Sequence, residues 1–177
     1  MNIMIPPKRE DPTPYKIESF ESYYSRWPRE LENVPEDVVR QWVHYHNESV
    51  LECSNIYKIA NWVFELKVFS NEEILEVSHY PSELEHMDNN GDILMTQGME
   101  GYDTAEFMLQ NGTFPCPIIV AHNAGSHNHQ KSIGSETMLE PYHLIEGHRR
   151  LGFVRGMIKH DYEQLKPEHK VWLVTIP

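Results

Sequence analysis

The feature that most constrains the fold is a short apolar run that leads through a glycine to two adjacent arginines. Residues 142–146 have the composition of a buried strand, Gly147 interrupts it, and residues 148–158 have the apolar spacing of a helix. The first turn of a helix presents backbone N–H groups without intrahelical acceptors and a partial positive charge. Arg149 and Arg150 add charge-assisted donors for phosphate oxygens. We therefore predict a strand–glycine–helix unit whose N-terminal turn binds phosphate.

Each polar residue of this unit also has a structural interpretation. Arg149 and Arg150 could pair with nearby acidic side chains, because cations at a helix N-terminus oppose the helix dipole and need an anionic partner. Glu146 could activate water, or it could orient Arg150 through an ion pair. His148 could contact phosphate or cap the helix. We favour phosphate binding for the arginines and the ion pair for Glu146.

The charge of the chain is unevenly distributed. Residues 143–177 hold six Lys/Arg against four acidic residues, whereas the first 142 residues hold nine against 23, a net charge of −14 within a total of −12. This acidity argues against nonspecific DNA binding, which depends on neutralising phosphates. It suits a basic protein partner, or it serves only to keep the protein dissolved.

Composition predicts a folded cytoplasmic protein. The hydrophobic fraction is 40% over 177 residues, enough for the core of one compact unit. No apolar run approaches the roughly 20 residues that span a bilayer, and the first residues lack the pattern of a secretory signal. Cys53 and Cys116 are too few for a disulfide framework and lack metal-site spacing.

Residues 1–69 predict an arm followed by helices. Residues 1–30 are rich in Pro, Tyr and charge and indicate an extended cover. A helix is expected from a cap at Asn33 to about Leu51, and a second one from Ser54 to Phe64. We expect these two helices to form a hairpin that packs on the rest of the chain.

Residues 70–177 predict alternating strands and helices. In chain order we expect a strand at 73–80 that ends before a proline, a turn at 88–92, a helix at 104–110 that ends at a glycine, and an apolar strand at 117–122. A polar loop at 123–140, the strand and helix described above at 142–146 and 148–159, and a closing strand at 170–176 follow.

This order of elements resembles the ParB/sulfiredoxin superfamily, in its ParB-like branch, over about residues 70–177. Four pieces carry the resemblance: the opening strand that ends at Pro81, the helix, glycine and Pro-Ile-Ile-Val strand of residues 107–120, the Gly-His-Arg-Arg box of residues 147–150, and the apolar final strand. The resemblance implies an α+β fold, in which a small mixed sheet carries packed helices. Here the N-terminal helical hairpin would precede that domain and pack on it.

Members of this superfamily bind nucleoside triphosphates. Sulfiredoxins and free-serine kinases use ATP, and chromosome-partition ParB proteins bind and hydrolyse CTP. By motif, the following residues would surround the triphosphate of ATP or CTP with its Mg²⁺: Gly147, His148, Arg149 and Arg150. Sulfiredoxins have a cysteine immediately before the His-Arg pair, where this chain has Gly147, so sulfinic-acid repair is not expected. The absence of an evident helix-turn-helix segment argues against chromosome partition.

The segment after the opening strand departs from the family pattern. ParB proteins have an Asn-x-x-Arg type pattern there, which helps to close the nucleotide site, whereas residues 81–87 hold acids and no arginine. Glu83 or Glu85 could hold Mg²⁺ or act as a general base. We assign the catalytic role to Glu83 and the metal to Glu85. The same acids could instead mark a degenerate site that repels triphosphate.

Histidines gather at the start of the predicted loop. The density of His122, His127 and His129 is compatible with Zn²⁺, but the sequence spaces no fourth ligand to close such a site. We therefore interpret these histidines as loop residues.

Two functions follow from these observations. The phosphate box favours a nucleotide-binding phosphotransferase or phosphohydrolase, with Glu83 and Glu146 as candidate catalytic residues. The acidic surface, the altered opening motif and the unmatched N-terminal region favour a noncatalytic antitoxin or immunity protein that neutralises a basic nuclease.

Overall fold

The computed structural model describes residues 4–13, 15–53, 57–129 and 136–177. The chain forms two compact units, Met1–Phe64 with Ile176–Pro177, and Glu65–Thr175. Helices and a five-stranded mixed sheet make up the described structure, so the α+β class is confirmed. Among the described residues, no helix has both the length and the apolar character needed to cross a membrane.

The first unit consists of short helical segments around an aromatic core. Trp42 and Trp62 are buried and stack with ring centroids 5.9 Å apart, and Tyr57 lies against both rings. The segments are, in order, α1 Phe20–Tyr24, η1 Arg29–Leu31, α2 Glu36–Val38, η2 Val39–His44, α3 Asn47–Glu52 and η3 Ile59–Asn61. The predicted first helix is therefore divided into three pieces, with a π-helical stretch in the middle.

The second helix of the predicted hairpin is wrong from Val63 onward. Its expected start at 54–56 lies outside the described residues, Ile59–Asn61 is a single 3₁₀ turn, and Val63–Ser70 is strand β1. The apolar residues of this stretch coincide with helical spacing, but β-branched and aromatic side chains from Val63 onward favour a strand. Asn33 does not cap a helix: α2 begins at Glu36 without a side-chain cap, and the Asn33 amide donates to the carbonyls of Ile59 and Trp62.

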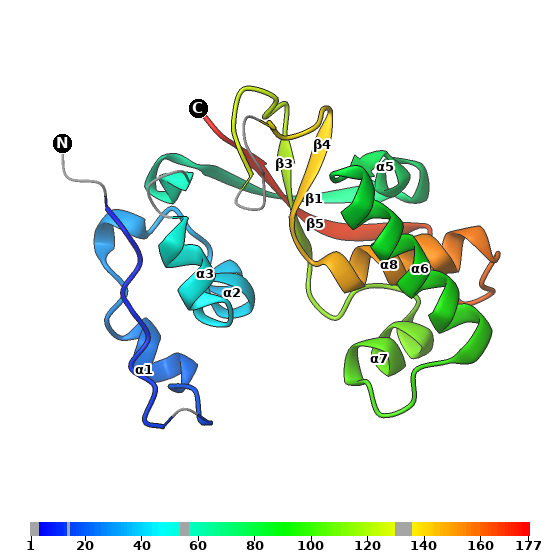
Figure 1. Ribbon diagram of the computed structural model, residues 1–177, viewed down its shortest axis with the longest axis horizontal. Helices are drawn as coiled ribbons and strands as arrows, with labels where there is room; N and C mark the ends of the chain where they lie inside the picture. Colours follow the sequence, from blue (N-terminus) through cyan, green and yellow to red (C-terminus); the bar gives the residue numbers. More distant parts are fainter. Residues whose placement is uncertain (1–3, 14, 54–56, 130–135) are drawn as a thin grey trace. The chain divides into compact units, whose positions relative to one another are not determined.

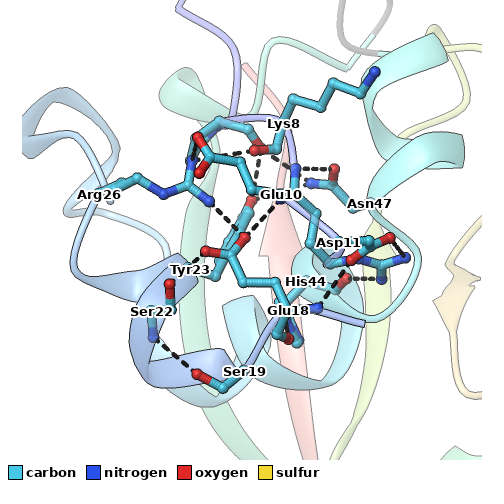
Figure 2. Close-up of polar contacts among 12 residues, drawn as sticks. Lys8, Glu10, Asp11, Glu18, Ser19, Ser22, Tyr23, Arg26, His44 and Asn47 are labelled. Carbon is cyan, nitrogen blue, oxygen red and sulfur yellow. Dashed lines mark hydrogen bonds and ion pairs between the residues drawn. The ribbon is translucent and has the colours of Figure 1, made fainter. Parts of the chain in front are cut away.

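A buried carboxylate fastens the N-terminal arm to α1. Glu18 is 6% exposed, and it accepts hydrogen bonds from Arg26 Nη2 at 2.5 Å, Ser22 Oγ at 2.6 Å and the backbone N–H of Glu10 at 2.8 Å (Figure 2). Burial alone would raise the pKa of Glu18, but these donors outweigh it and lower the pKa to about 2. The arm is thus held by specific polar contacts.

The second unit is built on a mixed sheet (Figure 1). The strand order is β1-β5-β3-β4-β2, in which β3 pairs with β5 in parallel and with β4 antiparallel, and β2 pairs with β4 in parallel. The strands after β1 are β2 Val77–Ser78, β3 Ile118–His122, β4 Tyr142–Glu146 and β5 Glu168–Thr175. The helices are α5 Asn71–Glu76, α6 Pro81–Gln97, α7 Asp103–Asn111 and α8 His148–Lys159.

The helices and the central strands share one hydrophobic core. Its buried members come from helices α5 to α8 and from all five strands, and include Met87, Leu94, Met108, Ile118, Val120, Leu144, Leu151, Phe153, Val154, Met157 and Val171. Burial of these apolar side chains is the main force that holds α8, and with it the glycine–arginine box, against the sheet.

Helices α6 and α8 lie side by side (Figure 1) and approach closely at glycines. A Cβ on Gly91 would overlap the carbonyl oxygen of Gly152 and lie 2.9 Å from Gly156 N. The turn predicted at 88–92 is therefore wrong: these residues lie within α6, where a glycine permits the helix contact. The acids of this stretch also point to α8, since Asp88 pairs with Arg155 at 2.6 Å.

The opening strand is shorter than predicted. Residues 73–76 belong to helix α5, which begins with a reciprocal hydrogen-bonded cap between Ser70 and Glu73, and only Val77–Ser78 forms strand β2. The other predicted elements from residue 103 onward are confirmed, with small shifts at their ends. The described part of segment 123–140 holds no named strand, as expected for a loop.

Candidate functional site

The N-terminus of α8 has the backbone geometry of an anion site. Gly147 precedes the helix with φ of 109°, a backbone conformation that residues other than glycine rarely adopt. A Cβ at this position would also lie 2.5 Å from Ile118 Cγ2, so the glycine is needed for packing as well as for the turn. Among the described residues, no side-chain hydrogen bond caps this helix end.

A pocket of about 350 Å³ lies between this helix end and α6. It is lined by Glu83, His86, Met87 and Asn90 of α6 and by His148 and Arg149 of α8. The four α6 residues share one helix face because they follow the spacing of three and four positions. The structure thus brings together three residues that the sequence singled out, Glu83, His148 and Arg149.

Arg149 is exposed and is held by a tyrosine. Its Nη1 donates to Tyr102 Oη at 2.6 Å, and its guanidinium carbon lies 5.0 Å from the centre of the Tyr102 ring. This contact combines a hydrogen bond with a cation–π interaction and uses only part of the guanidinium's donors. Arg149 is also one of the residues that line the pocket.

Arg150 lies on the interior side of the helix. It is 8% exposed, and its Nη1 donates to the carbonyl oxygens of Cys116 at 2.7 Å and Pro117 at 3.0 Å. Its Nη2 lies 3.5 Å from Glu146 Oε1, which confirms the predicted ion pair. Arg150 is not among the residues that line the pocket. Its contacts tie α8 and the end of β4 to the segment that leads into β3.

Glu85 does not lie with the other candidate residues. It is exposed on α6, and it is not among the pocket-lining residues. Two positions along a helix correspond to a rotation of about 200°, so a helix that turns Glu83 toward the pocket turns Glu85 away. The assignment of Mg²⁺ to Glu85 stays a prediction, and Glu83 is the carboxylate whose position suits that task.

A second group of polar side chains is buried beside the pocket. The nitrogen atoms that His79, His129 and His143 can offer to a ligand lie within 4.8 Å of one another, and all three side chains are buried. The ring centroid of His148 lies 5.1 Å from that of His79. Burial, and secondarily the neighbouring His79, lowers the pKa of His143 to about 3, so this imidazole is neutral at physiological pH.

The sequence identified only one member of this group. Of the three histidines considered there, His129 belongs to the group, whereas His122 packs against the Tyr142 ring and His127 is half-buried. His79 and His143 were missed. Their signal was present, because each stands in or next to a short apolar strand, where an unexplained polar residue points to a binding role.

Comparisons with known proteins add no identification. No family model, curated protein or solved structure matches the chain. The ParB/sulfiredoxin resemblance therefore stays a prediction, and the function has to be argued from the residues themselves.

Proposed function

We propose that this chain binds the phosphate groups of a nucleoside triphosphate in the pocket between α6 and the N-terminus of α8. The observation that carries the proposal is the convergence of Arg149, His148 and the N-terminus of α8 on one pocket. The volume of about 350 Å³ falls within the range of small-molecule sites. A triphosphate would be recognised by the backbone N–H groups of the helix and by the Arg149 guanidinium.

Glu83 gives this pocket a metal requirement. A carboxylate that faces a phosphate repels it unless a cation lies between them, and Mg²⁺ is commonly bound by one or two carboxylates together with phosphate oxygens. We therefore expect nucleotide binding to depend on Mg²⁺. The metal and Arg149 would also stabilise the charge of a transferred phosphoryl group, which is the main catalytic task in such reactions.

In this proposal the residues of the box and the neighbouring Glu146 have two kinds of role. His148 and Arg149 contact the ligand, whereas Arg150 and Glu146 hold the turn in place through the ion pair and the carbonyls before β3. Glu146 thus serves as a positioning residue, and Glu83 is the acid placed to act on the substrate.

Calorimetric titration with ATP and with CTP, with and without Mg²⁺, tests the proposal. Loss of a charge-assisted hydrogen bond costs about 1.5–3 kcal/mol, so Arg149→Gln should weaken binding by roughly 10-fold or more. Lys159→Gln is the matched control, since it removes the same charge at the opposite end of the same helix. Glu83→Gln should reduce the dependence on Mg²⁺.

Two results would contradict the proposal. One is the absence of heat with either nucleotide in protein that circular dichroism shows to be folded. The other is an equal loss of affinity in Lys159→Gln and Arg149→Gln, which would indicate a general charge effect and no defined site.

A further inference from the structure

Three buried histidines come together from separate parts of the second unit. His79 follows β2, His143 lies on β4, and His129 belongs to the segment after β3. The parallel pairing of β2 with β4 places Ser78 opposite His143, and His79 is the next residue along the chain. Their exposed fractions are 1% or less. The ring centroids lie 4.7 to 5.0 Å apart, so the three imidazoles form one compact group.

The spacing of the nitrogen atoms is close to that of a metal site. Ligand nitrogens at the usual distance of about 2.1 Å from a tetrahedral Zn²⁺ lie about 3.4 Å from one another. The candidate atoms here lie within 4.8 Å, so binding requires an approach of at most about 1.4 Å between any two of them. His129 is not held in a named strand, and a small shift of its segment can supply much of this approach.

The chemistry of His143 suits a ligand. Its Nδ1 accepts a hydrogen bond from the backbone N–H of Leu139 at 3.1 Å, so the neutral ring carries its proton on Nε2, the nitrogen that remains for a metal ion. Within the described parts of the chain this buried Nε2 has no hydrogen-bond partner. Metal binding at Nε2 therefore moves this proton to Nδ1, with loss of the Leu139 hydrogen bond, and His79 has the same requirement because its Nδ1 accepts from the backbone N–H of Tyr80 at 2.8 Å.

We propose that His79, His129 and His143 bind a divalent transition-metal ion, with Zn²⁺ as the ion that this donor set fits best. Imidazole nitrogens favour Zn²⁺ and its neighbours over Mg²⁺ or Ca²⁺, which prefer oxygen ligands. Three histidines leave a further position for water or for a substrate oxygen, as in catalytic zinc sites. The His148 ring lies beside that of His79 and also lines the phosphate pocket, so the ion would lie near that pocket.

The test uses untagged protein, because an affinity tag of histidines would bind metal itself. Chelator-treated protein is titrated with Zn²⁺ by calorimetry, the bound metal is counted by elemental analysis, and Co²⁺ is used as a visible probe of coordination. We expect one equivalent of Zn²⁺ per chain and a Co²⁺ spectrum of low coordination number. Loss of an outer-shell partner costs about 10–100-fold in metal affinity, so His79→Asn and His143→Asn should cost more than about 100-fold.

Two further variants serve as matched controls. His122→Asn and His127→Asn remove histidines of the same stretch that do not belong to the group, and they should leave the affinity unchanged. If His143→Asn fails to fold, His129→Asn tests the same site from outside the sheet. The proposal is overturned if the unaltered protein takes up no stoichiometric Zn²⁺, or if the control variants lose as much affinity as the ligand variants.

This inference stands apart from the proposed nucleotide binding. Arg149→Gln should weaken nucleotide binding by roughly 10-fold or more and leave the Zn²⁺ titration unchanged, because Arg149 is not one of the three ligands. A protein that binds Zn²⁺ but neither nucleotide would contradict only the proposed function. A protein that binds nucleotide but no Zn²⁺ would contradict only the metal site.

Discussion

Replacement of Glu18 by Gln should destabilise the first unit in a pH-dependent manner. The carboxylate accepts hydrogen bonds from Arg26, Ser22 and the backbone of Glu10, and its pKa is lowered to about 2 from an ordinary value of 4.5. Because the pKa is lower in the folded chain, the ionised carboxylate stabilises the fold above about pH 4.5. This contribution decreases as the pH falls below that value and is lost near pH 2.

The size of the effect follows from the same shift. A difference of about 2.5 pKa units corresponds to at most about 3.4 kcal/mol of unfolding free energy. The side chain of Glu18 is 5% exposed but that of Arg26 is 31% exposed, so solvent screens the pair. We therefore expect the variant to be less stable by about 1–2 kcal/mol at neutral pH, with the difference disappearing toward pH 2.

The measurement has to report on the first unit alone. Trp27, Trp42 and Trp62 belong to that unit and Trp172 to the other, so a Trp172→Phe background restricts fluorescence to the first unit. Urea unfolding of this protein with and without Glu18→Gln then gives the free-energy difference at each pH. Glu30→Gln, at an exposed position of the same unit, is the control for loss of one negative charge.

A difference in stability that stays constant from neutral to acidic pH would refute the reasoning. So would an equal pH dependence in Glu30→Gln, since the effect would then come from net charge and not from the contacts of Glu18.

Two other variants test the framework of the site. Gly91→Ala places a methyl group against the backbone of Gly152, so we expect a loss of about 1–3 kcal/mol in thermal or urea unfolding and weaker nucleotide binding, because α6 and α8 together line the pocket; unchanged stability would show that the helices separate freely. Arg150→Lys removes the guanidinium group that donates to the carbonyls of Cys116 and Pro117, so it should lower the free energy of unfolding by about 1–3 kcal/mol. Arg149→Gln should leave the free energy of unfolding unchanged. The reverse pattern would contradict the assigned roles.

The sequence predicts the elements that local signals determine. Strand β4 and helix α8 were predicted with correct limits, because an apolar run, a glycine in a left-handed turn and helical spacing follow one another directly. Helix α7 was predicted for the same reason, since Gly112 ends it with φ of 66°. These signals act within a few residues and do not depend on tertiary contacts.

Helix α6 shows where such signals fail. Residues 88–92 have the composition of a turn, yet they lie in the middle of a 17-residue helix. Position 91 holds a glycine because the backbone of α8 packs directly against it. Positions 88 and 92 hold aspartates that pair with Arg155 and Lys159 of α8. Each of these reasons lies in another element, so no local pattern could have revealed it.

The histidine group depends even more on tertiary structure. His79 and His143 become neighbours only through the parallel pairing of β2 and β4, and a strand of two residues carries too weak a sequence signal to predict that register. His129 stands in a histidine-rich stretch, but the other two histidines of that stretch, His122 and His127, do not belong to the group. Local density of histidine was therefore a poor guide to which side chains meet.

The two arginines of the box could have been distinguished from the sequence by helical periodicity. Successive residues of a helix are rotated by about 100°, so neighbours cannot both face the same ligand with equal ease. Leu151, Val154 and Met157 form the buried stripe of α8, and Arg150 borders that stripe, whereas Arg149 lies outside it. In the proposed phosphate site, one of the two adjacent arginines would thus serve the ligand and the other the scaffold. That division explains why the pocket contains Arg149 while Arg150 donates to backbone carbonyls.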